Sequence, residues 1–143
     1  MGFFDKMKSM KNAITGGGAK VFIICDNFSL VEPFEIIVKA QIKDADIKIS
    51  RVYLDIIGSE EIVIRDSEGT FESNSDTVNI NFDIAGGGIL KANELYEWKA
   101  MIELPKDSPA IYYGNDCTHT YQAKVGLDAP GNDPDSGWIR LHE

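Results

Sequence analysis

The sequence is poor in the residues that build metal sites, disulfide frameworks and membrane spans. Its 143 residues hold only two cysteines and two histidines, too few for a disulfide scaffold or a structural zinc site. No apolar run approaches the roughly 20 residues that cross a bilayer. Basic residues are also scarce, because 14 lysines and arginines face 23 acidic residues and the formal net charge is −9. That balance argues against nucleic acid as a partner, since phosphate binding needs a basic surface.

What is present fits one globular domain. The length and a hydrophobic fraction of 43% suffice for a single core. The first residues hold lysines but no compact apolar stretch behind them, so we expect no secretory signal. We therefore expect a cytoplasmic protein whose two cysteines, Cys25 and Cys117, stay as buried thiols.

The chain begins with an amphipathic pattern that ends in glycine. Residues 1–18 predict a short helix and a hinge, because apolar residues recur at helical spacing before the triple glycine at 16–18. Residues 1–20 hold four lysines against Asp5 alone, a net charge of +3, so the remainder carries −12. Two interpretations stay open: the helix packs on its own domain, or it binds an anionic membrane or a partner groove. The residues that would make this contact are Phe3, Phe4, Lys6, Met7, Lys8, Met10 and Lys11.

From residue 19 onward the apolar period changes from helical to twofold. Turn-type residues separate most of the expected strands, which lie at residues 20–26, 34–43, 47–58, 60–66, 76–84, 94–105, 118–128 and 136–143. We expect residues 47–58 and 60–66 to pair as a hairpin and the glycines at 86–88 to form a turn. The alternation on one face indicates antiparallel sheets with one solvated side each. The predicted fold is therefore all-β, an antiparallel two-sheet β-sandwich over residues 19–143.

The polar clusters have simpler explanations than catalysis. The acidic loop at 128–135 has the residue types of Asx-turns and lacks the EF-hand spacing, and calcium stays as the alternative. His119 falls on the inward face of its expected strand, where a hydrogen-bonded core histidine is the first interpretation. A Cys117–His119 nucleophile pair would need an oxyanion hole that we cannot assign to any residue. We expect no catalytic residue, no cofactor and no metal, and hence no enzyme.

The segment from residue 97 to residue 127 resembles the arrestin fold. A strand ends in Leu-Pro, a second proline follows four residues later, then come two tyrosines and a glycine before the next strand. The pattern looks like the bacterial sporulation-control (Spo0M-like) branch of arrestin-like proteins. The matching residues are Trp98, Leu104, Pro105, Pro109, Tyr113, Gly114, Tyr121, Val125 and Leu127.

The rest of the chain agrees with this resemblance in most places. The paired phenylalanines near the start, the glycine-rich approach to the first strand, and residues 28–43 and 47–58 all match. The chain departs from the family pattern at Phe34 and Ala40, where the family has glycine. The resemblance covers nearly the whole chain, but only the first of the two sandwich domains typical of the family.

The resemblance implies a non-catalytic adaptor or regulatory scaffold that acts through protein–protein contacts. Sheet edges would supply the contact surface, and Tyr112, Tyr113 and Trp138 are candidate contact residues near strand ends. Two alternatives stay open: a structural subunit of a homo-oligomer that associates through edge strands, and a peripheral membrane protein anchored on an anionic surface through residues 1–14.

Overall fold

The computed structural model of the protein describes residues 18–143. The expected N-terminal helix and its seven candidate contact residues lie outside this range. The described chain contains eight strands and no helix: β1 (Ala19–Ile24), β2 (Phe34–Ile42), β3 (Ile47–Asp66), β4 (Gly69–Leu90), β5 (Leu95–Ile102), β6 (Tyr112–Tyr113), β7 (Cys117–Leu127) and β8 (Ile139–Leu141).

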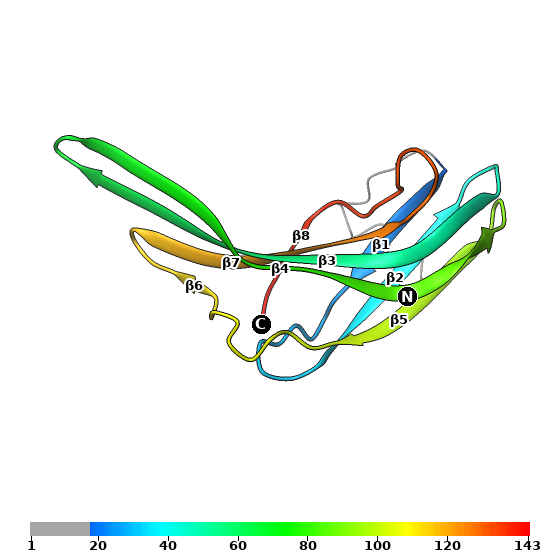
Figure 1. The fold of residues 1–143 in the computed structure, drawn as a ribbon, viewed down its shortest axis with the longest axis horizontal. Coiled ribbons are helices and arrows are strands. Elements are labelled where there is room, and N and C mark those ends of the chain that lie inside the picture. Colours follow the sequence, from blue (N-terminus) through cyan, green and yellow to red (C-terminus); the bar gives the residue numbers. More distant parts are fainter. Residues whose placement is uncertain (1–17) are drawn as a thin grey trace.

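These strands form two antiparallel sheets that stack face to face (Figure 1). One sheet has the order β1-β2-β5. The other has the order β4-β3-β7-β6, and β8 also pairs with β7. The predicted β-sandwich is therefore confirmed.

The core lies between the two sheets and follows the twofold alternation of the sequence. On β2, every second residue from Phe34 to Ile42 is at most 1% exposed, while the residues between them are more exposed. Phe28, from the loop after β1, packs edge-on against Phe34 at 5.1 Å and tilts against Tyr121 at 5.6 Å. Tyr121 is among the largest fully buried side chains, so the family-like segment contributes directly to the core.

Strands β3 and β4 form one long hairpin, so the expected separate strand at 60–66 is wrong. Residues 60–66 continue β3, and their partner is the first part of β4. The pairing changes register after Val52 and after Gly58, where β4 has an extra residue. Beyond the second bulge the hairpin extends past the sandwich, on the left in Figure 1, and its tip turns at Gly69, which has a φ of 140°.

The expected glycine turn at 86–88 is also wrong. These glycines lie inside β4. The chain turns after β4, where Asn93 has a φ of 63° and donates its N–H to the carbonyl of Lys43. The carboxylate of Asp46 accepts the N–H of Ala92 and so stabilises the same turn.

Candidate functional site

The open side of the sandwich lies where the edge strands β4 and β5 come together. Each of them ends its sheet, and within residues 18–143 no other strand pairs with the free edge of β5. Figure 1 shows the two strands running along the same side of the sandwich. We call this side the seam, and it is the surface on which an extended partner segment could lie.

The register of β2 and β5 shows which backbone groups of β5 face the seam. The N–H of Ile42 donates to the carbonyl of Glu94 at 3.0 Å, so this pair is directly hydrogen-bonded. In an antiparallel ladder such pairs alternate with pairs that point away from each other. Tyr96, Trp98 and Ala100 therefore bond to β2. The alternate residues, which direct their N–H and C=O groups to the free edge, are Leu95, Glu97, Lys99 and Met101.

Apolar side chains line the seam without being fully buried. Tyr96 and Trp98 stack with their ring centroids 5.9 Å apart. They and Ala100 are half-buried, as are three inward residues of β4, namely Ile80, Phe82 and Ile84. At the far end a hollow of about 300 Å³ lies between residues 77–80 and the loop at 105–109. The seam thus combines free backbone groups with apolar surface that a partner strand would cover.

The loop at 105–111 is held in place from below by two inward residues of β7. His119 is fully buried, with Nδ1 3.0 Å from the carbonyl of Ala110 and Nε2 2.5 Å from the hydroxyl of Thr77. The hydroxyl of Tyr121 donates to the carbonyl of Pro109 at 2.5 Å. The prediction of a hydrogen-bonded core histidine is therefore confirmed.

This arrangement does not bring Cys117 and His119 into a nucleophile–base pair. Both ring nitrogens of His119 have other partners. The Sγ of Cys117 lies 3.0 Å from the hydroxyl of Tyr112, which also donates to Glu60 at 3.1 Å. The hydrogen bond with Cys117 and then burial raise the pKa of Tyr112. Both cysteines are half-buried free thiols.

The three candidate contact residues within the described chain are all exposed, but they differ in what holds them. Tyr112 is 40% exposed and stacks on His119, whereas Tyr113 is 65% exposed. Trp138 is 38% exposed and its ring lies 4.9 Å from the ammonium of Lys124. They accompany β6 and β8 along one edge of β7, opposite β3. The structure therefore does not bring them to the β4–β5 seam.

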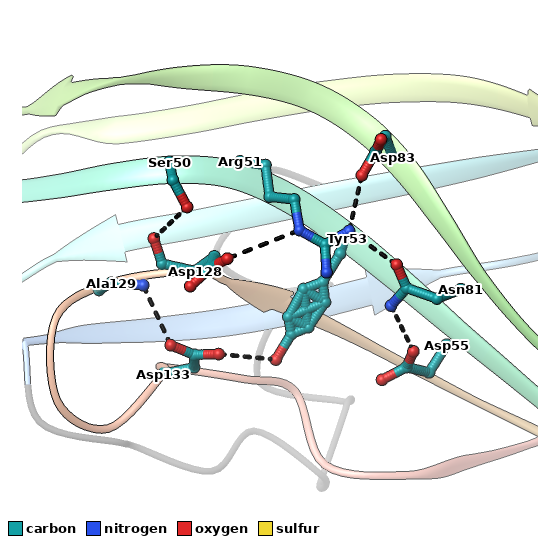
Figure 2. A network of polar contacts seen from close by, with 9 residues as sticks. All are labelled: Ser50, Arg51, Tyr53, Asp55, Asn81, Asp83, Asp128, Ala129 and Asp133. Carbon is teal, nitrogen blue, oxygen red and sulfur yellow. Dashed lines mark hydrogen bonds and ion pairs between the residues drawn. The ribbon is translucent and has the colours of Figure 1, made fainter.

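The outer face of the five-stranded sheet carries a polar network centred on Arg51 (Figure 2). Its Nη1 donates at 2.6 Å to both Asn81 and Asp83 on β4, and its Nε lies 3.6 Å from the carboxylate of Asp128. Asn81 in turn donates to Asp55 at 2.6 Å. The hydrogen bond with Asp83 raises the pKa of Arg51, so the charges of this network hold one another in place.

Tyr53 lies beneath this network and is 8% exposed although it points outward. Arg51 sits 5.0 Å over its ring, and its hydroxyl donates to Asp133 at 3.2 Å (Figure 2). A Cβ at Gly126 would lie 2.5 Å from the ring, so only glycine fits there. Burial, and next the charge of Asp133, raise the pKa of Tyr53.

The acidic loop at 128–135 is occupied by its own hydrogen bonds. Asp133 accepts the N–H of Ala129 with its second carboxylate oxygen, and Asp135 accepts the N–H of Gly137. Among the described residues no group of three or more histidines, cysteines or acidic residues is placed to hold a metal ion. The loop therefore covers Tyr53, and the calcium alternative gains no geometric support.

A second hollow, of about 660 Å³, lies on the same outer face nearer the projecting hairpin. It is polar, and its lining consists of Ser59, Glu61, Asn74, Ser75, Asp76, Thr118, Thr120, Gln122 and Arg140. Thr118 pairs with Tyr113, and Lys124, farther along β7, lies under Trp138. The two exposed aromatics therefore stand at opposite ends of this hollow along β7.

Comparisons with known proteins bear on the fold. No family model and no curated protein matches the sequence. Among solved structures, the chain is similar to Spo0M, a sporulation control protein from Bacillus subtilis, with a TM-score of 0.66 and 20% sequence identity. The match covers 88% of this chain and 49% of the Spo0M chain, so this chain spans about half the length of that structure. The likeness confirms the arrestin-like, Spo0M-like fold that the sequence resemblance predicted.

The residues of the seam were not among those that sequence reasoning selected. The alternation placed Trp98 correctly on the inward face, but it could not show that β5 ends its sheet. A usable signal was the pair Tyr96–Trp98, because two large aromatics on one short strand need more cover than a six-residue neighbour such as β1 provides. Within residues 18–143, no helix long and apolar enough to cross a membrane is present.

Proposed function

We propose that the protein is a non-catalytic, arrestin-like adaptor or regulatory scaffold that binds an extended segment of a partner protein along the free edge of β5. The seam carries this proposal. It presents an eight-residue edge strand beside apolar side chains that are only half-buried. An added strand would gain backbone hydrogen bonds and would bury the apolar seam at the same time.

Strand β5 suits this role better than the other edges. The inward residues of β1 are already buried, with Val21 at 0% and Ile23 at 1% exposure, so a strand added there would cover little further apolar surface. Strands β6 and β8 have only two and three residues. On β5, Trp98 and its inward neighbours still have surface to bury, which gives an added strand a favourable free energy.

The charge of the chain indicates the chemistry of the partner. The net charge is −9, so a segment with lysine or arginine on its solvent side and apolar residues on the alternate side would fit best. The likeness to a sporulation control protein supports the regulatory part of the proposal. A cytoplasmic location is the expectation from the sequence.

A proline on the free edge tests this mode of binding. Lys99→Pro removes one backbone donor that points away from β2, a position at which an edge strand tolerates proline. The matched control, Lys99→Thr, loses the same charge but keeps the N–H. We expect partners recovered from a cell extract on immobilised full-length protein to fall about tenfold with Lys99→Pro, because one hydrogen bond is lost and the ring clashes with the added strand.

The comparison of variants decides the outcome. Partners that are lost with proline but retained with threonine support the proposal. Equal recovery on the wild type and on Lys99→Pro, with circular dichroism showing an intact sheet, would refute strand addition at β5. If Lys99→Pro does not fold, Met101→Pro removes the next donor of the same row and gives the same test.

A further inference from the structure

The outer face of the three-stranded sheet contains apolar residues that are buried on the wrong side. Phe22 is 6% exposed and Ile24 is 5% exposed. Both alternate with Val21 and Ile23, which point into the core, and neither belongs to the contiguous core cluster. They therefore point away from the sandwich interior, yet something removes them from water.

The cover of these residues is not one of the described strands. Both sheets share a single core, and the five-stranded sheet lies on the inner side of β1 and β2. The comparison with Tyr53 is instructive, because that outward aromatic is buried by Arg51, Gly126 and Asp133. Nothing comparable among the described side chains accounts for the burial of Phe22.

The cover extends over β1 and β2 but not over β5. Lys39, which pairs with Phe22 across the strands, has a side chain only 14% exposed although it reaches Glu97 at 3.3 Å. On the β5 part of the same face, Leu95 is 43% and Met101 is 65% exposed. The covered area is thus a strip about one helix wide, which we call the β1–β2 patch: Phe22, Ile24, Ile37 and Lys39.

We propose that residues 3–14 of this chain form a helix that docks on the β1–β2 patch in cis, with its apolar side facing Phe22 and Ile24. The segment has the right composition, because Phe3, Phe4, Met7, Met10 and Ile14 recur at helical spacing.

The length and the position of the segment fit the patch. Twelve residues in a helix extend about 18 Å, and the six residues of β1 extend about 20 Å. The chain turns back toward β1 at the glycines 16–18. The carbonyl of Gly18 accepts the N–H of Lys43, which fixes the hinge beside the beginning of β1.

Charge favours the same placement. The lysines at positions 6, 8 and 11 lie mostly away from the apolar side of the predicted helix. The patch is flanked by exposed acidic residues, Asp26 after β1 and Glu35 on β2, and the body of the protein is strongly acidic. Docking in cis therefore satisfies the basic segment and the apolar patch together.

The test uses the full-length chain with Phe3→Ser and Phe4→Ser introduced together. We expect the side-chain NMR signals of Phe22, Ile24 and Ile37 to shift, because they lose the aromatic rings that cover them. The signals of Leu95 and Met101, on the uncovered part of the same face, serve as internal controls and should not move. Unchanged signals of Ile24 and Ile37 would overturn the proposal.

A second variant separates loss of docking from loss of fold. Asn12→Ser lies on the polar side of the predicted helix and should leave all five signals in place. The signal of Tyr53, on the opposite outer face, should be the same in every variant. If the double serine variant does not fold, Met7→Ser alone provides the same comparison with a smaller expected shift.

Two other occupants of the patch are distinguished by the same signals. A second copy of the chain would make the Ile24 and Ile37 shifts depend on protein concentration and would give a dimer by sedimentation, which would overturn docking in cis. Vesicles with anionic lipid would withdraw the helix if it preferred a membrane, and the wild-type signals would then move to those of the double serine variant, which would also overturn the proposal. Concentration-independent signals that persist with vesicles support it.

Discussion

The two outer faces of this sandwich both bury an aromatic residue, and they do so by different means. On the five-stranded sheet, Tyr53 lies under a network of charged side chains and under the chain's own loop at 128–135. On the three-stranded sheet, Phe22 is equally buried but has apolar neighbours and no polar network. The first face is closed by local hydrogen bonds, whereas the second needs a separate apolar cover.

The difference shows how a small sandwich can have two kinds of surface. A polar cover formed by neighbouring strands and a connecting loop holds its position through short-range contacts. An apolar cover contributed by a distant segment is held mainly by buried area, so it can in principle be exchanged for another apolar surface. Substitutions on the two faces should therefore differ in size and in their response to salt and pH.

The largest effect is expected from removal of the buried ring on the three-stranded sheet. Phe22→Ala should lower the free energy of unfolding by about 3 kcal/mol, because a large buried side chain is lost. Met101→Ala, on the exposed part of the same face, should change it by less than about 0.5 kcal/mol. Urea unfolding of both variants measures this difference. Equal losses would mean that the two halves of the face are covered alike.

The next effect concerns the close approach beneath the polar network. Gly126→Ala should cost about 2 kcal/mol, because the new methyl group would overlap the ring of Tyr53. Gly131→Ala in the neighbouring loop meets no atom, although its φ of 85° is itself unfavourable for alanine. Thermal unfolding with solvent exposure of Tyr53 as a second readout distinguishes the two. A Gly126→Ala protein with an unmoved Tyr53 ring would contradict the expected overlap.

A smaller effect is expected from the hydroxyl of Tyr53. Tyr53→Phe removes the hydrogen bond to Asp133 and should cost about 1 kcal/mol near neutral pH. The pKa of Tyr53 is raised in the folded protein, so the folded state holds this proton more tightly than the unfolded chain does. Its stabilising contribution is present below about pH 10, the usual pKa of tyrosine, and is lost as pH rises through the folded-state pKa.

The alkaline part of this prediction is measured as a difference. Stability of the wild type should fall more steeply above about pH 10 than that of Tyr53→Phe. Tyr121, whose pKa is also raised by burial, contributes to both proteins and cancels. Parallel pH profiles would show that the phenol of Tyr53 is as easily ionised in the folded state as in the unfolded one.

The smallest effect is expected from the charges of the network. Arg51→Gln should lower the midpoint of urea unfolding slightly at low ionic strength. The difference from the wild type should vanish near 1 M salt, where the Debye length is about 3 Å. Phe22→Ala, measured as the apolar counterpart, should keep its full effect at both salt concentrations. A salt-independent loss for Arg51→Gln would indicate packing over Tyr53 instead of charge.

Much of the fold could be predicted from local pattern. The twofold alternation placed His119, Trp98 and Tyr121 on the correct faces, because side chains alternate along any strand whatever its partner. The same pattern failed at the long hairpin, because residues 47–58 and 60–66 are joined by Gly58 and Ser59, which resemble a turn. The structure keeps the strand continuous, since Gly58 lies against the ring of Tyr121 and a bulge on β4 absorbs the irregularity.

The candidate site was less accessible to sequence reasoning. The exposed aromatics Tyr113 and Trp138 were selected correctly as surface residues, but they accompany β7 and not the seam. The turn expected at 86–88 became part of β4, where a Cβ at Gly87 would meet the carbonyl oxygen of Ser50 at 2.7 Å. In each case the deciding neighbour lies far along the chain, and no local pattern identifies it.

The sequence by itself determined the class of the fold and the direction of nearly every strand residue, because alternation, turn residues and charge act over a few positions. Only the tertiary structure decided that β5 ends its sheet beside β4 and that Phe22 is buried on an outward face. Both depend on which strands meet, and strand order is set by the summed packing of segments far apart in the sequence. The surfaces on which function depends here are therefore properties of the assembled sandwich.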